Sequence, residues 1–309
     1  MSTTTITATA PAHNVEVHLA IDGQEQAAIR PRVADTFMDG LSTLDGTGIT
    51  IGRSAPMSGI PTFTDPYEHQ RWALERMAGA FRVMARKDYL EGTAGHISLR
   101  DPVDPHTFWI NPLAVHFGLM RVSHLVQVNM EGEIIGGNRA CINNAGFHIH
   151  AELHKARPDV NAACHFHSVH GKAWSCFGRP LDMLTQDACT FYKDHAVHNT
   201  FGGIALEASE GVAIAAGLGN KRCAILKNHG LLTTGHTVDE AAYLYTLMEN
   251  ACRVQLLAEA AAASGIAKEL CPDDAAEYTY RLTTPEAMWL EFQPDYQYEL
   301  AMSNGDFLL

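Results

Sequence analysis

The chain has 309 residues, 46% of them hydrophobic, and a formal net charge of −13 at neutral pH, a composition typical of an ordinary globular protein with one large domain or two small ones. The excess of acidic residues argues against nucleic acid or an anionic membrane as the main partner, and no apolar run approaches the roughly 18 residues needed to span a bilayer. The seven cysteines are scattered, odd in number and without a Cys-x-x-Cys pair, which predicts reduced thiols in a cytoplasmic protein.

The N-terminal part of the chain predicts an irregular extension followed by a helix. Residues 1–66 are expected to be partly disordered, because they begin with an uncharged Thr/Ala-rich stretch and end in a Gly/Pro/Ser/Thr-rich one. The start also lacks the basic residues and the apolar segment of a secretory signal. An amphipathic helix is expected over residues 67–88, where Met77, Phe81 and Met84 share one face.

Beyond this helix, short strands and helices alternate without a regular βαβ rhythm. The expected strands are 96–99, 107–111, 125–129, 133–135, 162–167 and 223–226. The expected helices are 145–157, 169–177, 210–216 and the long alanine-rich 238–264. The pattern predicts a mixed, layered α/β domain over residues 67–264. Residues 265–309 are expected to form a C-terminal tail that packs on this domain or on a neighbouring subunit.

The most informative stretch holds two histidines separated by one residue. His165 and His167 fall in an expected strand, where alternate side chains emerge on one face roughly 6.5–7 Å apart. His229, further along the chain, would complete a three-histidine site. Imidazole is a common ligand of zinc, iron and copper. Three protein ligands leave a coordination position for water or substrate, whereas a structural zinc site has a fourth protein ligand. The pattern therefore indicates a metalloenzyme.

Three segments taken together resemble the class II aldolase/adducin family. They are Gly92-Thr-Ala-Gly-His-Ile-Ser98, Arg157-Pro-Asp-Val-Asn-Ala-Ala-Cys-His-Phe-His167 and Asn228-His-Gly230. The resemblance covers residues 67–264 and implies a three-layer α/β/α sandwich around a central mixed or antiparallel β-sheet. It also implies a homotetramer or other homo-oligomer, and a divalent metal bound by His165, His167 and His229.

Residues around the metal site of the family's sugar-phosphate aldolases differ in this protein. Their Ser-Ser-Glu run corresponds to Asn144-Ala-Gly146, so Gly146 stands where those enzymes have the glutamate that shuttles a proton. Their Gly-Asn-x-Ser phosphate segment has His96 in place of the amide, and their Thr-Pro-Thr-Gly turn reads Asn111-Pro-Leu-Ala114. These changes remove donors that would reach an anion. Retro-aldol cleavage of a phosphorylated sugar is therefore disfavoured.

Within the family, the chain is more similar to a branch that contains the non-haem iron oxygenases of aminocoumarin antibiotic pathways. The segments concerned are 144–146, 171–175 and 186–192. This resemblance implies an Fe(II) oxygenase that uses O2 to cleave a carbon–carbon bond in the side chain of a small 4-hydroxyaryl 2-oxo or 2-hydroxy acid. Three histidines leave Fe(II) three open positions, enough for a bidentate acid and dioxygen.

Two other functions stay open at this point. Zn(II) or Mn(II) in the same site would support a redox-neutral lyase, an aldolase or decarboxylase acting on a non-phosphorylated substrate. A scaffold without activity, as in the metal-free adducin branch, is the third possibility, but the presence of all three histidines argues against it. Only the oxygenase would consume dioxygen.

Three further residues are candidates for catalytic roles. His96 lies on the loop that binds phosphate in the aldolases, and it would pair with a carboxylate or a phenolic oxygen, or make a structural hydrogen bond instead. His150, on the helix before the metal strand, is a candidate acid or base, with a supporting hydrogen bond as the alternative. Tyr192 belongs to a polar loop expected to close over the pocket or to contact solvent or another subunit. Gly217-Leu-Gly219 lacks the context of a dinucleotide fingerprint, so no nicotinamide cofactor is inferred.

Overall fold

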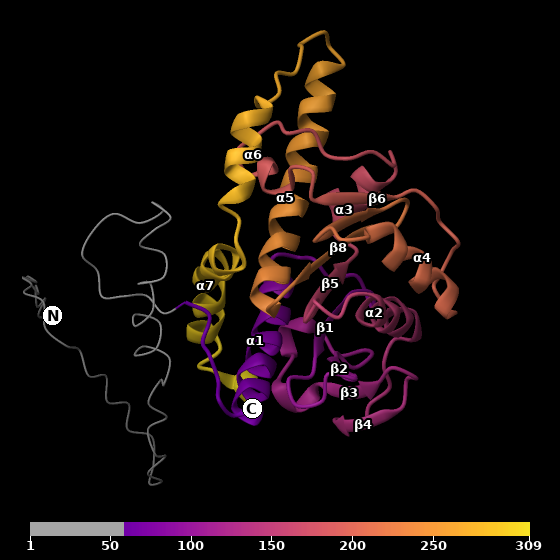
Figure 1. Cartoon of the computed structure of the whole chain (residues 1–309), viewed down its shortest axis with the longest axis vertical. Coiled ribbons are helices and arrows are strands. Elements are labelled where there is room, and N and C mark those ends of the chain that lie inside the picture. The colour runs from indigo at the N-terminus through magenta and orange to yellow at the C-terminus, as the bar shows by residue number, and fades with distance from the viewer. Residues whose placement is uncertain (1–58) are drawn as a thin grey trace, which may run out of the picture.

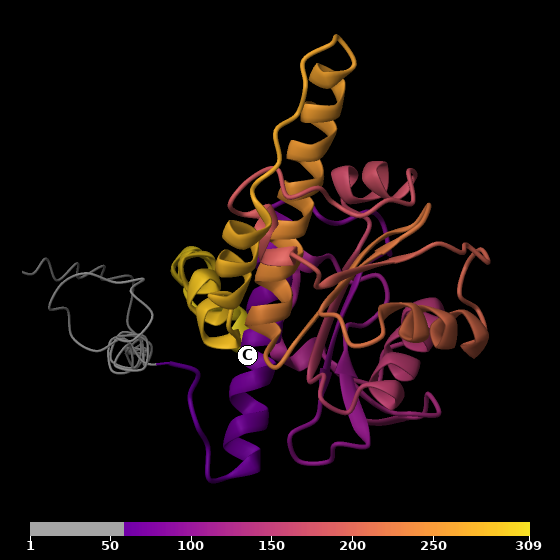
Figure 2. The same ribbon diagram turned by 45° about the horizontal axis from the view of Figure 1, so that its top comes forward.

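The computed structural model describes residues 59–309. Most of the extension expected over residues 1–66 therefore lies outside the described residues. The described residues form one eight-stranded mixed sheet with helices on both faces, as Figures 1 and 2 show. The strand order is β4-β3-β2-β1-β5-β8-β7-β6, and every neighbouring pair is antiparallel except β6–β7.

The strands are β1 (His96–Arg100), β2 (Thr107–Ile110), β3 (Val126–Asn129), β4 (Ile134–Gly137), β5 (Ala162–Phe166), β6 (His195–His198), β7 (Cys223–Leu226) and β8 (Gly230–Gly235). The α-helices are α1 (Pro66–Arg86), α2 (Asn144–Ala156), α3 (Val169–Ser175), α4 (Ala208–Leu218), α5 (Val238–Ala262), α6 (Asp273–Arg281) and α7 (Pro285–Met302). Short 3₁₀ turns occupy η2 (Phe117–Leu119), η3 (Val122–His124), η4 (Ala188–Phe191) and η5 (Asp306–Leu308). The expected α/β fold with helices on both sides of a central mixed sheet is confirmed.

The two faces of the sheet are covered by different helices. Alternate side chains of a strand point to opposite faces. On β1, Ile97 and Leu99 therefore join the larger core, which is shared with α1, α5 and α7. His96 and Ser98 point the other way, toward α2. The helices α2 and α4 cover that second face over a smaller apolar cluster, and Figure 2 shows the sheet between the two helix layers.

The helix α7 belongs to the larger core, although the sequence indicated only a packed tail there. Phe292 of α7 is fully buried in the same apolar cluster as α1. The buried guanidinium of Arg76 on α1 pairs with Asp239 and donates to Gln293 Oε1 at 2.7 Å, while stacking 3.3 Å from the ring centre of Tyr296. The helices α1 and α7 are thus joined through both polar and apolar contacts.

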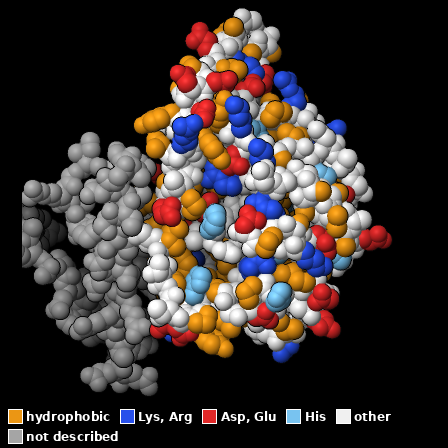
Figure 3. Space-filling model, viewed as in Figure 1, with side chains coloured by type: hydrophobic (Ala, Val, Ile, Leu, Met, Phe, Trp, Pro, Cys, Tyr) orange, Lys and Arg blue, Asp and Glu red, His pale blue; other side chains and the backbone are white. Residues whose placement is uncertain are grey.

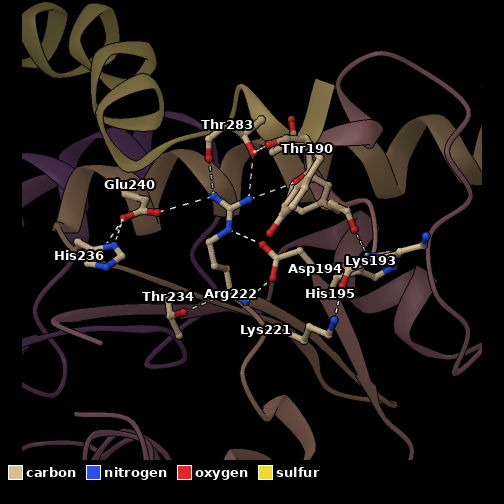
Figure 4. Close-up of polar contacts among 12 residues, drawn as sticks. Thr190, Lys193, Asp194, His195, Lys221, Arg222, Thr234, His236, Glu240 and Thr283 are labelled. Carbon is tan, nitrogen blue, oxygen red and sulfur yellow. Dashed lines mark hydrogen bonds and ion pairs between the residues drawn. The ribbon is translucent and has the colours of Figure 1, made fainter. Parts of the chain in front are cut away.

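Arg222, just before β7, ties the connection between α6 and α7 to the sheet (Figure 4). Its guanidinium donates to Asp194 and, at 2.9 and 3.1 Å, to the backbone oxygen and the hydroxyl of Thr283. It also lies 3.8 Å from Glu240 on α5. Burial alone would lower the pKa of Arg222, but its carboxylate partners raise it. Asp194 is 7% exposed, so its carboxylate is largely withdrawn from water and pairs with Arg222 instead.

The surface carries no large field of one sign on the face shown in Figure 3, where acidic and basic side chains are interspersed with apolar ones. Among the described residues, no helix combines the length and the apolar character needed to cross a membrane.

Candidate metal centre

Three histidines meet where β5 ends and β8 begins. His165 lies in β5, His167 directly follows that strand, and His229 occupies the turn between β7 and β8. Antiparallel pairing of Phe166 with Leu231 brings these segments to the same end of the sheet. One ring nitrogen from each histidine lies within 4.8 Å of the other two. That spacing allows all three imidazoles to ligate one ion.

The hydrogen bonding of His165 fits a metal ligand. Its Nδ1 lies 2.9 Å from the carbonyl oxygen of Leu231. A carbonyl only accepts, so Nδ1 carries the proton and Nε2 presents a lone pair. Nε2 is buried and has no hydrogen-bond partner in the described structure. Burial also lowers the pKa of His165, and it lowers that of His229 to about 4, so both rings are neutral and able to bind a cation at neutral pH.

A buried carboxylate fixes the chain immediately after β5. Glu249 of α5 accepts from the Ser168 hydroxyl and from the backbone N–H groups of His170 and Gly171, which belong to the first turn of α3. Four residues earlier on the same helix face, Tyr245 donates from its hydroxyl to the carbonyl oxygen of Phe166 at 2.8 Å. These contacts hold the backbone on both sides of His167. Sequence reasoning missed this pair, although polar residues four apart in an alanine-rich helix were the available signal.

His96 lies directly beside the three histidines. It pairs with His165 across β1 and β5, and the two rings stack with centres 5.5 Å apart. A Cβ added to Gly146 would lie 2.5 Å from His96 Nε2 and 2.8 Å from its Cε1. The imidazole of His96 therefore fills the space that a side chain at position 146 would enter. Burial lowers its pKa well below the ordinary value.

His150 lies behind His96, away from the three ligands. The rings of His150 and His96 meet edge to face with centres 5.5 Å apart. The Nδ1 of His150 is 2.6 Å from the hydroxyl of Ser98, and its Nε2 is buried without a partner. Burial lowers the pKa of His150 to about 3.

The structure places the third catalytic candidate, Tyr192, at the opposite end of the sheet. Tyr192 precedes β6, whose first residue pairs with Cys223 at the start of β7, whereas the histidines lie beyond the far end of that strand. Its ring packs with Cys189 and with Ala276 of α6. The expectation that this segment closes over the pocket is therefore wrong for Tyr192 within one protomer. The cause is the parallel β6–β7 pairing, which spacing alone did not reveal.

Other residues form the mouth of the site. The ring of Phe201, which follows β6, has its centre 6.5 Å from that of His229 and is 52% exposed. Lys172 of α3 pairs with Glu91, and both lie close enough to His167 to act on its ring. The pKa of His167 is lowered by burial and by Lys172, and raised in part by Glu91, so both charges act on this ligand. The site is thus bordered by an aromatic ring and by a cation.

Comparisons with known proteins agree with this fold and site, which together define an α/β protein whose three-histidine group fits a divalent metal. Residues 75–256 match the model of the Class II Aldolase and Adducin N-terminal domain. The chain belongs to the class II aldolase/adducin family, and the resemblance seen in its sequence is confirmed.

Relatives and a solved structure support the same assignment. Decarboxylase NovR from Streptomyces niveus is 41% identical over 244 residues, which cover 78% of this chain and 88% of that protein. The 4-hydroxy-3-prenylphenylpyruvate oxygenase/4-hydroxy-3-prenylbenzoate synthase from Streptomyces roseochromogenus subsp. oscitans is also 41% identical over 244 residues, which cover 78% of this chain and 86% of that one. The solved structure of L-fuculose 1-phosphate aldolase from Glaciozyma antarctica PI12 is 38% identical with a TM-score of 0.73, covering 80% of this chain and 96% of that chain.

Proposed function

We propose that this protein is a non-haem Fe(II) oxygenase that cleaves a carbon–carbon bond in the side chain of a small 4-hydroxyaryl 2-oxo or 2-hydroxy acid. The observation that supports this most is the filling of the space at Gly146 by the His96 ring. Where the family's aldolases carry a carboxylate as proton shuttle, this protein has a buried imidazole whose pKa is lowered by burial. Carbanion chemistry needs an acid-base residue near the substrate, whereas oxygen activation depends less strongly on such a residue.

The residues of the site would have distinct roles. His165, His167 and His229 would hold the ion, with His165 oriented by the Leu231 carbonyl. Fe(II) held there would supply electrons to dioxygen and open positions for an acid substrate. Lys172 provides a cation beside His167 for a substrate carboxylate, in exchange for its present partner Glu91.

The aromatic part of such a substrate has a surface available next to the ion. The half-exposed ring of Phe201 lies beside His229, where it can contact an aryl ring edge to face. The 41% identity to a protein described as a prenylphenylpyruvate oxygenase supports the same substrate class.

A redox-neutral lyase with Zn(II) or Mn(II), acting on a non-phosphorylated substrate, is the second candidate. Two comparisons favour it, the 41% identity to a protein described as a decarboxylase and the structural similarity to one described as an aldolase. The same three imidazoles would suit zinc, which polarises a carbonyl without any redox change.

The deciding experiment is oxygen uptake by the Fe(II)-reconstituted protein with 4-hydroxyphenylpyruvate, 4-hydroxymandelate and related phenolic acids. Uptake coupled to a shortened aryl product is expected, with none from zinc-loaded protein. Turnover that persists without oxygen or with zinc would establish the lyase. In parallel, His229→Ala should lose bound metal by elemental analysis while its circular dichroism is unchanged. The matched control is His106→Ala, which removes an exposed histidine elsewhere and should keep the metal.

We infer a cytoplasmic protein, because all seven cysteines are free. We also infer a homotetramer or other homo-oligomer, supported by apolar side chains exposed near the end of α5, such as Leu257 and Leu270, which are 64% and 57% exposed. Light scattering on the purified protein tests this, and a monomer at micromolar concentration would contradict it.

A further inference from the structure

The helix α2 and the strand β1 face each other with matched spacing. Four residues of helix rise about 6 Å and two residues of strand about 6.6 Å, so each turn of the helix meets the next inward-pointing strand residue. The facing residues are Gly146, His150 and His154 on α2 and His96, Ser98 and Arg100 on β1. A row of polar side chains therefore runs from the partly exposed Arg100 inward to the candidate metal centre.

The hydrogen bonds along this row have a direction. Arg100 only donates. Its NH2 donates to the backbone oxygens of His154 and Arg157 at 2.7 and 3.1 Å and shares a hydrogen with His154 Nδ1 at 3.4 Å, which therefore accepts. The carbonyl of Val160 also lies near this ring, raises the pKa of His154 in part and accepts from Arg100 Nε at 3.1 Å. An N–H group on Nδ1 would face the Arg100 NH2 donor, so the direction assigned to His154 rests on the Arg100 contact. His154 then carries its proton on Nε2, which donates to the Ser98 hydroxyl at 2.8 Å. Ser98 has one proton, which goes to His150 Nδ1 at 2.6 Å.

Between His150 and His96 the described structure has no hydrogen bond, but each ring offers a buried nitrogen that lacks a partner. With Nδ1 accepting, His150 carries its proton on Nε2, which is buried and unpaired in the described structure. The Nδ1 of the neighbouring His96 is also buried and unpaired, and the two rings are in edge contact. Both histidines are at most 4% exposed. A buried donor beside a buried acceptor is satisfied by a direct hydrogen bond or by one bridging water.

We propose that Arg100, His154, Ser98, His150 and His96 form a one-directional donor chain that ends in an N–H group on His96 Nε2, directed at a substrate oxygen. The acceptor is the carboxylate or carbonyl oxygen of the acid, so this assignment rests on the proposed function. His96 Nε2 is the atom nearest the Gly146 space after Cδ2. The row thus places a hydrogen-bond donor where the family's aldolases have an acid-base carboxylate. His96 binds substrate, and the other four residues are positioning residues.

The proton positions can be measured directly in the metal-free protein. Long-range ¹H–¹⁵N spectra of ¹⁵N-histidine-labelled protein distinguish the two neutral tautomers of each ring, with His150→Phe and His154→Phe used to assign signals. We expect the Nε2–H tautomer at His154, His150 and His96. The Ser98→Ala variant should lose this preference at His150, and Ser98→Thr, which keeps a hydroxyl, should retain it. An Nδ1–H tautomer at His150 in the wild-type protein would overturn the proposed donor chain, whatever the variants do.

Ligand binding tests the end of the donor chain separately. The probe is 4-hydroxyphenylpyruvate, titrated into zinc-loaded protein so that no oxidation occurs. His96→Leu should weaken binding about tenfold, and His96→Gln, whose amide donates from a position close to that of Nε2, by no more than about threefold. Equal weakening by Leu and Gln would overturn the donor role. No binding by the wild-type protein, with tautomers as expected, would instead overturn the proposed substrate and the acceptor named here.

Discussion

Adding one methyl group at position 146 tests whether His96 fills the place of the missing side chain. In Gly146→Ala, the new Cβ would lie 2.5 Å from His96 Nε2, whereas ordinary contacts begin at 3.4 Å. The ring cannot retreat freely, because His165 stacks on it and the edge of His150 meets it. Overpacking of this kind costs about 1–3 kcal/mol. Replacing glycine by alanine in a helix otherwise gains about 0.4–1 kcal/mol.

The sign of the effect should therefore depend on residue 96. In the wild-type background, Gly146→Ala is expected to lower the free energy of unfolding by up to about 2.6 kcal/mol, the difference between the two terms. In a His96→Ala background the clash is absent, and the same change should raise it by about 0.4–1 kcal/mol. The coupling between the two positions is then about 1–3 kcal/mol.

Urea unfolding of the four proteins in this cycle measures the coupling, with metal removed so that ligand binding does not contribute. Circular dichroism of the folded state is the control for helix content. If Gly146→Ala stabilises both backgrounds equally, the His96 ring does not occupy this space. The absence of a carboxylate at position 146 would then have a cause other than the His96 ring.

Three other predictions concern residues away from the three ligands. Arg222→Met should lower the free energy of unfolding by about 2–4 kcal/mol, because Asp194 is left buried without its cation; urea unfolding measures it, and a loss below about 0.5 kcal/mol would contradict the pairing. The hydrogen bond that the His236 ring donates to Glu240 raises the pKa of His236. This pair therefore stabilises the fold below the unfolded pKa of 6.5 and loses that contribution as the pH rises through the folded pKa. Because the His236 side chain is 60% exposed, His236→Gln should lower the free energy of unfolding by only a few tenths of a kcal/mol at about pH 5.5 and by nothing measurable at about pH 9. Thermal unfolding at both pH values measures this, and an equal loss at both would refute the linkage. Tyr192→Phe should leave metal content and turnover unchanged, since Tyr192 lies at the far end of β6, and a tenfold loss of turnover would contradict that placement.

Local patterns in the sequence were sufficient for part of the structure. The amphipathic helix starting near residue 67 and the strand that carries His165 and His167 follow from side-chain periodicity within single elements. The three histidines also come together as the ordered family segments indicated.

Features that depend on distant partners were not predictable in this way. The strand β6 and the helices α6 and α7 are held by contacts such as those of Arg222 with Thr283, which join residues far apart in the sequence. The role of Glu249 was hidden because a carboxylate in an alanine-rich helix is expected to be solvated until α3 is placed against it. The contact between His96 and Gly146 is visible only in the three-dimensional structure. In the sequence, each residue reads only as the separate loss of a residue that the aldolases have.

The position of α7 in the main core has a consequence for synthesis of the protein. The contact between Arg76 and Gln293 spans 217 residues, so α1 emerges from the ribosome long before its partner helix exists. Until then, part of the apolar face of α1 is uncovered and available to chaperones or to other nascent polypeptides. The match to the family model ends at residue 256. A fragment that ends there would retain all three histidines but lack Phe292 and Tyr296 from its core. Such a fragment would expose the apolar surface that these residues cover and would tend to aggregate.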